Sequence, residues 1–339
     1  MLQEIELTSP VDLCLPNGRL NPKAVGWSRQ PLQNCRLYGH PLRKKRWNYW
    51  CITSPSHLFS VTLSDVDYAG LPFVYFLDFA TGEFIEKTII TPLGKDIVLG
   101  DKVPDDATYE GKGCAINIRQ KRAGIQMLVD IADFGGKKLQ AEFQIVEPEM
   151  HESLNVVVPW SERLFQFTAK NNTLPAVGKV VLDEKEVAFD SENSFATLDF
   201  GRGVWPYKGF WNWASFSTRL PDGRALGVNF GAGWTDNTGS TENALCIDGR
   251  LIKLSEDVIF TYSTQDFKAP WKLQTAETKR VDLIFTPFFE RIAKTDMAII
   301  RSEVHQMIGY FDGTVEGEGG EMIKVSRAVG WAEDHHSRW

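Results

Sequence analysis

Carboxyl, amide and indole side chains gather in residues 201–254, the part of the sequence where chemistry is most readily expected. Asp236 and Glu242 closely follow Trp234 there. A carboxyl group that folds among indole rings loses its hydration, which raises its pKa and makes it a general acid for an alkene or a leaving oxygen. Asp236 and Glu242 are therefore the catalytic candidates. Turns also need Asp, Asn and Gly for backbone reasons, so a purely structural role for this cluster is the alternative.

Trp211 and Trp213 are the leading ligand-binding candidates. They are two positions apart and so share one face of a strand. Such a pair either fills a core or lines a pocket, where the indole N–H is a polar handle. Asn229 would hydrogen-bond a ligand carbonyl or cap a bulge. The predicted ligand-binding residues are Trp205, Tyr207, Trp211, Trp213, Asn229, Trp234 and Asn237.

Two carboxyl groups beside tryptophans also suit carbohydrate chemistry. Glycoside hydrolysis uses a pair of carboxyl groups separated by about 5–9.5 Å, and indole rings offer flat platforms for sugar rings. A carbohydrate-binding or carbohydrate-active protein is therefore an alternative interpretation of the same residues.

Metal-ligand residue types occur together only in the segment from Glu333 to His336. Adjacent histidines on a strand point to opposite faces and rarely share one metal, so an exposed polar terminus is the favoured interpretation and no metal is predicted. If this last strand closes a barrel instead, His335 or His336 would face a cavity. The sequence also has no phosphate loop, dinucleotide fingerprint, GxSxG elbow or HExxH motif, so no cofactor is predicted.

The basic run from Arg43 to Arg46 leads into an aromatic segment, a combination that can bind nucleic acid or phosphate. The formal net charge of −7 opposes attraction to nucleic acid, so a solvated turn before a strand is favoured. The five cysteines form no CxxC pair, which indicates free thiols in a reducing compartment. No signal peptide and no membrane span is expected, and the predicted location is the cytoplasm.

The elements that must position these residues are strands. Alternation from Phe210 to Phe216 has the period of a strand, and 12% aromatic residues favour a β-rich protein. Residues 221–224 form a turn, and Asp248-Gly249 between two apolar runs predicts a hairpin. A similarity at an offset of 98 to 99 residues, between segments starting at Tyr109 and Tyr207, indicates two related β-halves.

Several motifs together have a recognisable pattern: Gly26-Trp27-Ser28, Pro31-Leu32, Lys45 to Trp50, Asp199 to Tyr207, Trp211 to Ser215, Asn229 to Gly233, Gly330 to Asp334 and Trp339. They resemble a bacterial family known only as a domain of unknown function, itself distantly similar to AttH-like and hydroxyneurosporene synthase (carotenoid hydratase) proteins. The resemblance runs from about residue 15 to the end and is most specific in the tryptophan-rich centre.

The resemblance implies an all-β fold of two lipocalin-like (calycin) barrels, or strongly curved antiparallel sheets, packed side by side. The expected division is an N-terminal arm (1–40), a first β-domain (41–195) and a second β-domain (196–339). Such barrels hold one small apolar ligand.

The leading functional expectation is binding of a small lipophilic molecule, isoprenoid or fatty-acid-like, in a tryptophan-lined cavity of the second half. A non-redox hydratase or isomerase using Asp236 or Glu242 as the acid is the second interpretation. The carbohydrate interpretation and a structural or stress-related interaction protein complete the alternatives.

Overall fold

A computed structural model describes residues 2–297 and 300–338. Trp339, which contributes to the family resemblance, lies outside these residues. Nearly all regular structure is β, as predicted: two large antiparallel sheets, a small parallel pair and two short 3-10 turns. The small elements are β1 (Val11–Asp12), β3 (Gln33–Asn34), η1 (Pro22–Ala24) and η2 (Glu318–Gly320). Within the described residues, no helix has the length and apolar character needed to cross a membrane.

The first sheet has 16 strands and curls back over itself. Its strands are β2 (Trp27–Ser28), β4 (Lys44–Thr53), β5 (His57–Asp65), β6 (Ala69–Gly70), β7 (Phe73–Asp78), β8 (Phe84–Thr88), β9 (Thr91–Pro92), β10 (Ile97–Leu99), β11 (Ala107–Gly111), β12 (Cys114–Lys121), β13 (Gly124–Phe134), β14 (Lys137–Ile145), β15 (Leu154–Pro159), β16 (Phe165–Leu182), β17 (Lys185–Phe189) and β18 (Phe195–Val204).

The second sheet has nine strands in the order β22-β21-β20-β19-β27-β26-β25-β24-β23 and is also strongly curled. Its strands are β19 (Lys208–Arg219), β20 (Ala225–Ala232), β21 (Ala244–Ile247), β22 (Arg250–Lys253), β23 (Val258–Thr261), β24 (Trp271–Thr275), β25 (Val281–Met297), β26 (Ile300–Glu316) and β27 (Met322–Arg338).

The chain passes from the first sheet to the second at residues 205–207. The boundary expected at 195/196 coincides with the start of β18, which pairs with β4 and β16 and so lies in the first sheet. The N-terminal segment contacts both sheets. Glu6 forms a β-bridge with Trp27 of β2, while Glu4 forms a buried ion pair with Lys253 at 2.5 Å and accepts a hydrogen bond from the Thr241 backbone N–H at 2.9 Å. This segment therefore supports the loop that carries Glu242.

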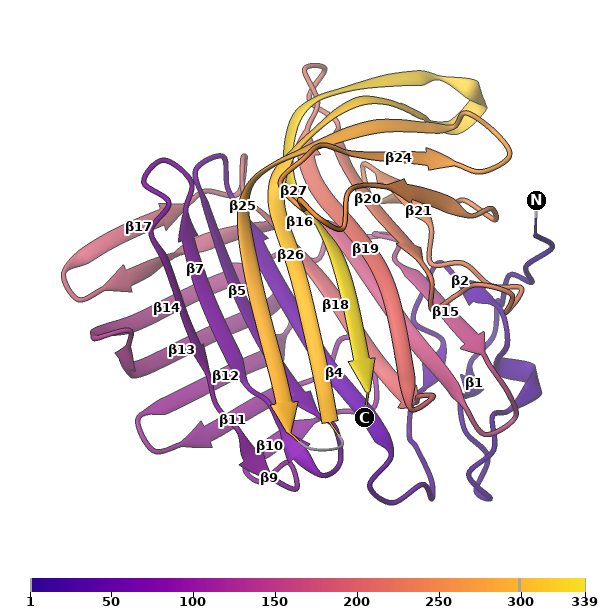
Figure 1. Ribbon diagram of the computed structural model, residues 1–339, viewed down its shortest axis with the longest axis horizontal. Helices are drawn as coiled ribbons and strands as arrows, with labels where there is room; N and C mark the ends of the chain where they lie inside the picture. The colour runs from indigo at the N-terminus through magenta and orange to yellow at the C-terminus, as the bar shows by residue number, and fades with distance from the viewer. Residues whose placement is uncertain (1, 298–299, 339) are drawn as a thin grey trace.

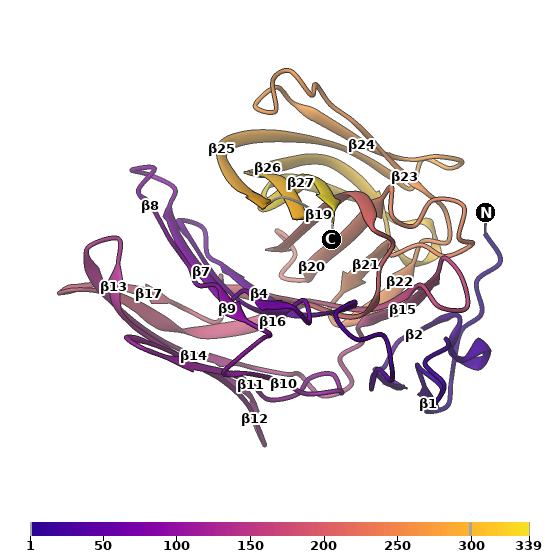
Figure 2. The same cartoon turned by 60° about the horizontal axis from the view of Figure 1, so that its bottom comes forward.

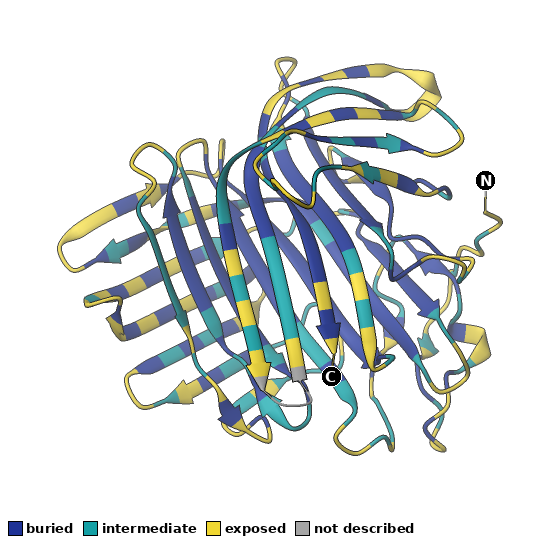
Figure 3. Cartoon of the chain, in the orientation of Figure 1, coloured by how far each residue is buried: buried dark blue, intermediate teal, exposed yellow. Residues whose placement is uncertain are grey.

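Three layers follow one another through the molecule: β10 to β14, then β4, β5, β7 and β18, then the second sheet (Figures 1 and 2). The long strand β16 joins the first two layers, since its first part pairs with β18 and its last part with β14. The middle layer is buried on both faces, and Figure 3 shows continuous burial there against alternating exposure in β11 to β14.

Alternation along the middle strands separates an apolar face from a polar one. In β16, Phe167 and Ala169 pack into the core of the first half, whereas Thr168 and Lys170 point the other way, toward the second sheet. In β18, Phe200 packs into the same core, and Asp199 points to the opposite face of the strand. The period of two therefore brings buried polar groups to the face where the two sheets meet.

The second half has its own packed core inside the curl of its sheet. Ala214 and Phe216 of β19 and Ala332 of β27 belong to it, together with Trp271 and Phe285. The residues that alternate with these core positions along β19 and β27 therefore point out of the curl, toward the first sheet.

Candidate functional site

A cavity of about 580 Å³ lies between the two sheets. Strands of the middle layer form one wall, and β19, β25, β26 and β27 form the other. Its aromatic lining is made of Trp47, Tyr49, Phe73, Trp205, Trp211, Trp213 and Trp234. Its polar and charged lining includes Thr62, Ser64, Glu86, Thr168, Lys170, Asp199, Glu242, Arg291, Ser302, Gln306, Glu333 and His335.

One lysine and two carboxylates form a buried cluster in this cavity. Lys170 and Asp199 are directly opposite on β16 and β18, with Nζ 2.9 Å from Oδ2 of Asp199 and 3.1 Å from Oε2 of Glu242. Burial disfavours the charged lysine, but Asp199 and Glu242 outweigh it, and the pKa of Lys170 lies above its usual value. Lys170 is therefore a fixed cation in the wall of the cavity.

Glu242 is held in place from several sides. Its Oε1 accepts a hydrogen bond from Trp234 Nε1 at 2.5 Å, and its backbone carbonyl accepts one from Asn229 Nδ2 at 2.6 Å. Gly231 leaves the room that the carboxyl needs, because a Cβ there would lie 1.9 Å from Oε1. Burial raises the pKa of Glu242, and the nearby Lys170 opposes this shift.

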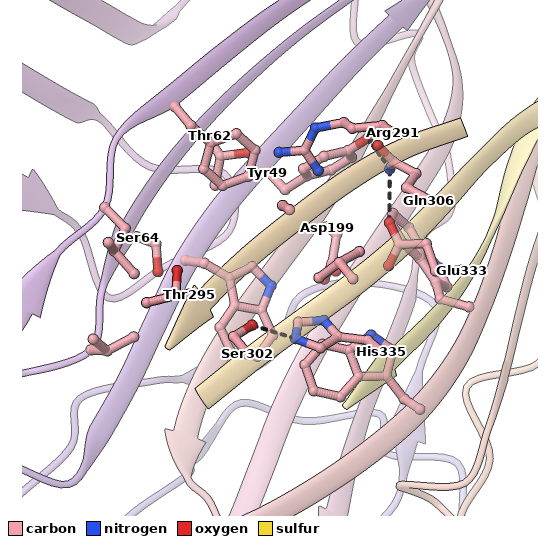
Figure 4. A pocket seen from close by; sticks show the side chains of 18 of the residues that line it. Tyr49, Thr62, Ser64, Asp199, Arg291, Thr295, Ser302, Gln306, Glu333 and His335 are labelled. Carbon is pink, nitrogen blue, oxygen red and sulfur yellow. Dashed lines mark hydrogen bonds between the residues drawn. The ribbon is translucent and has the colours of Figure 1, made fainter. Parts of the chain in front are cut away.

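Glu333 on β27 is a third buried carboxyl group, and its closest partner is neutral. Its Oε1 accepts a hydrogen bond from Gln306 Nε2 at 2.7 Å (Figure 4). Gln306 is oriented by Tyr75, whose hydroxyl donates to Oε1 of the amide at 2.8 Å, while Tyr49 OH lies 2.9 Å from Tyr75 OH. Burial raises the pKa of Glu333 to about 7, against the opposing effect of Arg291. Glu333 thus exchanges its proton near neutral pH, as a general acid must.

Two further groups complete the polar lining. Arg291 is engaged by Glu86 through two hydrogen bonds, of 2.6 and 3.1 Å. His335 Nε2 lies 2.9 Å from the Ser302 hydroxyl, and burial lowers the pKa of this histidine to about 3 (Figure 4). His335 is therefore neutral at physiological pH. Among the described residues, no group of three His, Cys, Asp or Glu is arranged to hold a metal ion.

The structure brings five of the residues singled out in the sequence to this cavity: Trp205, Trp211, Trp213, Trp234 and Glu242. Asn229 is buried behind them and accepts a hydrogen bond from Trp213 Nε1 at 2.8 Å.

Three other predicted residues lie outside the lining. Tyr207 is 44% exposed at the crossing between the sheets. Asp236 is exposed in a turn, where its Oδ1 accepts a hydrogen bond from the Gly233 backbone N–H at 3.0 Å. Asn237 is exposed beside it, with φ of 60°.

The position of the cavity differs from the expectation that it would lie inside the second half. Trp211 and Trp213 share one face of β19, as predicted, but this face points out of the curl, because Ala214 and Phe216 fill the interior. Lys170, Asp199 and Glu333 were not singled out from the sequence as site residues. The alternative that the last strand closes a barrel allowed His335 or His336 to face a cavity. The last strand, β27, lies inside the second sheet between β19 and β26, and His335 lines the cavity, with Glu333 two positions earlier on the same face.

The fold and the cavity define a class: two curled antiparallel sheets that enclose a tryptophan-lined, carboxyl-rich site between them. The chain belongs to the family described as a domain of unknown function (DUF2804), which matches residues 4–339.

Two solved structures are similar at low identity. One is a protein of Nitrosomonas europaea provisionally named AttH, with 14% identity, a TM-score of 0.49, and coverage of 86% of this chain and 92% of that chain. The other is kievitone hydratase from Nectria haematococca, with 11% identity, a TM-score of 0.45, and coverage of 91% of this chain and 97% of that chain. No curated protein sequence matches this chain.

Proposed function

We propose that this protein binds a small lipophilic molecule, isoprenoid or fatty-acid-like in its apolar part, in the cavity between its sheets. The observation that carries the proposal is a cavity of about 580 Å³ with five indole rings in its lining. Pockets for small organic ligands have volumes of roughly 300–1,000 Å³ and mostly apolar walls with a few placed polar groups. The polar cluster would then fix the orientation of the bound molecule.

The expected compartment is the cytoplasm. All five cysteines are buried and carry free thiols, a state that a reducing environment maintains.

Organic extraction of protein purified from its native host, followed by mass spectrometry, tests the binding proposal. We expect a stoichiometric apolar molecule whose return to the stripped protein quenches tryptophan fluorescence. An empty extract together with a fluorescence response only to oligosaccharides would favour the carbohydrate alternative. An empty extract with no response to either would favour a structural or interaction role.

A second candidate function is acid-catalysed hydration or isomerisation of the bound molecule, favoured by the raised pKa of Glu333. The protonated carboxyl would transfer its proton to an alkene carbon and become a carboxylate, leaving a carbocation beside the indole rings. In hydration, water would add to the cation and return a proton to Glu333. In isomerisation, the carboxylate would take a proton from the neighbouring carbon. Glu242 is less suited, because its carboxylate is paired with Lys170.

Glu333→Gln tests this second function. The amide keeps an oxygen that can accept the Gln306 hydrogen bond but carries no acidic proton, so we expect turnover of the extracted ligand to fall by about 10²-fold or more while binding persists. Hydration or double-bond migration is followed by mass spectrometry. Glu110→Gln, at an exposed position of β11 outside the cavity lining, is the matched control. Full turnover by the Glu333 variant would rule out this acid.

A further inference from the structure

Acidic side chains outnumber basic ones among the buried groups of the cavity. Arg291 and Glu86 balance each other as a bidentate pair. Lys170 faces two acidic side chains, Asp199 at 2.9 Å and Glu242 at 3.1 Å, so this cluster has one more acidic group than basic groups. A buried charge without a counter-charge is strongly unfavourable, and a bound cation is one way to balance it.

Glu333 adds a second acidic group to the same space. Its hydrogen-bond partner is the Gln306 amide, and the two nearest cations, Lys170 and Arg291, are each already paired with other carboxylates. With Glu333, these groups of the cavity include two more acidic than basic side chains. A ligand with one positive charge would therefore find a favourable electrostatic environment there.

The aromatic lining supports the same class of ligand. Indole faces attract cations, and quaternary ammonium groups are recognised by aromatic cages. Lys170 Nζ already lies 4.6 Å from the centre of the Trp213 ring, which shows a cation on one of these indoles. Trp205 and Trp234 stack at 5.4 Å, and both line the cavity beside Glu242.

We infer that the ligand is a lipophilic cation, an amine or quaternary ammonium compound, whose charged head lies among the carboxylates and indoles while its apolar part fills the rest of the cavity. This inference rests on the proposed binding function and names the chemical class of the ligand.

Binding of a cation should be linked to ionisation of Glu333. The charged groups that face Glu333 from neighbouring elements are Lys170, Asp199, Arg291 and Glu242, all held in the pairs described above. Tyr49, Cys51, Tyr75 and His335 are the uncharged titratable groups nearby, and burial keeps them neutral by raising the pKa values of the tyrosines and the thiol and lowering that of the histidine. Glu333, with a pKa of about 7, changes its charge near neutral pH, and a bound cation favours its carboxylate.

The test compares three probes with one apolar chain: octyltrimethylammonium, 1-octanol and octanoate, each titrated into the stripped full-length protein and followed by tryptophan fluorescence. We expect the cation to bind about tenfold more tightly than either of the others, since a desolvated cation–indole contact and an excess carboxylate both favour it. Its affinity should increase as pH rises through the pKa of Glu333 and become nearly independent of pH in Glu333→Gln. Glu110→Gln should keep the pH dependence of the wild type.

The outcomes separate this inference from the binding function itself. Equal or tighter binding of octanol or octanoate would overturn the cationic class while leaving a lipophilic ligand in place. Failure of all three probes to bind, together with an empty extract, would overturn both proposals. A thermal unfolding curve for Glu333→Gln shows whether this variant is folded. The comparison of the three probes uses wild-type protein, so it stands even if the variant does not fold.

Discussion

Lys170→Met is expected to destabilise the protein by about 3–5 kcal/mol near pH 8, because it removes the cation that balances two buried carboxylates. Methionine has a similar length and no polar end, so the loss reflects charge rather than volume. The loss should be smaller at pH 5, where a carboxylate without a counter-charge can take up a proton. Urea unfolding at both pH values measures the difference in the free energy of unfolding.

The triple variant Lys170→Met, Asp199→Asn, Glu242→Gln is the control for this prediction. It removes the charges together, and we expect it to recover most of the stability that the single variant loses. By contrast, Lys179→Met removes an exposed lysine whose ion pair with Glu186 at 2.8 Å is open to solvent, and this variant should change stability far less than Lys170→Met does. If Lys170→Met were as mild as Lys179→Met, the cluster would not be the buried charge system described here.

Glu333 is expected to make the wild type less stable with rising pH. Its pKa is raised by burial from 4.5 to about 7, so the folded protein retains a proton that the unfolded chain loses. The stabilising effect of this retained proton is full below pH 4.5 and is lost as pH rises to about 7. Over this window the wild type should lose about 3 kcal/mol relative to Glu333→Gln, since one pKa unit corresponds to about 1.4 kcal/mol.

The measurement is urea unfolding of wild type, Glu333→Gln and Glu110→Gln across this pH range. Taking the difference between wild type and variant cancels the other titrating groups of the chain. The Glu110→Gln curve should run parallel to that of the wild type, because Glu110 is exposed on β11. Parallel curves for wild type and Glu333→Gln would show that the pKa of Glu333 is the same in the folded and the unfolded protein, which would contradict the raised value.

Local patterns in the sequence determined much of the secondary structure. The alternation that begins at Phe210 predicted a strand, and β19 spans it. The Asp248-Gly249 hairpin is present between β21 and β22, with φ of 46° and 77°, because two residues with positive φ connect twisted strands in a tight turn. The pairing of Trp211 with Trp213 on one face follows from the same period of two. These features depend on neighbours in the chain, so the sequence is sufficient to predict them.

Tertiary structure alone decided where those faces point. A period of two says which residues share a face but not which layer the face meets, and the indoles of β19 were expected inside the second half, whereas they line the space between the sheets. Lys170 and Asp199 are opposite each other because of the register of β16 with β18. Glu333 joins them only because β27, in the second sheet, faces these two strands across the cavity. Charges that meet from distant strands change one another's pKa values, so the site exists only in the folded protein.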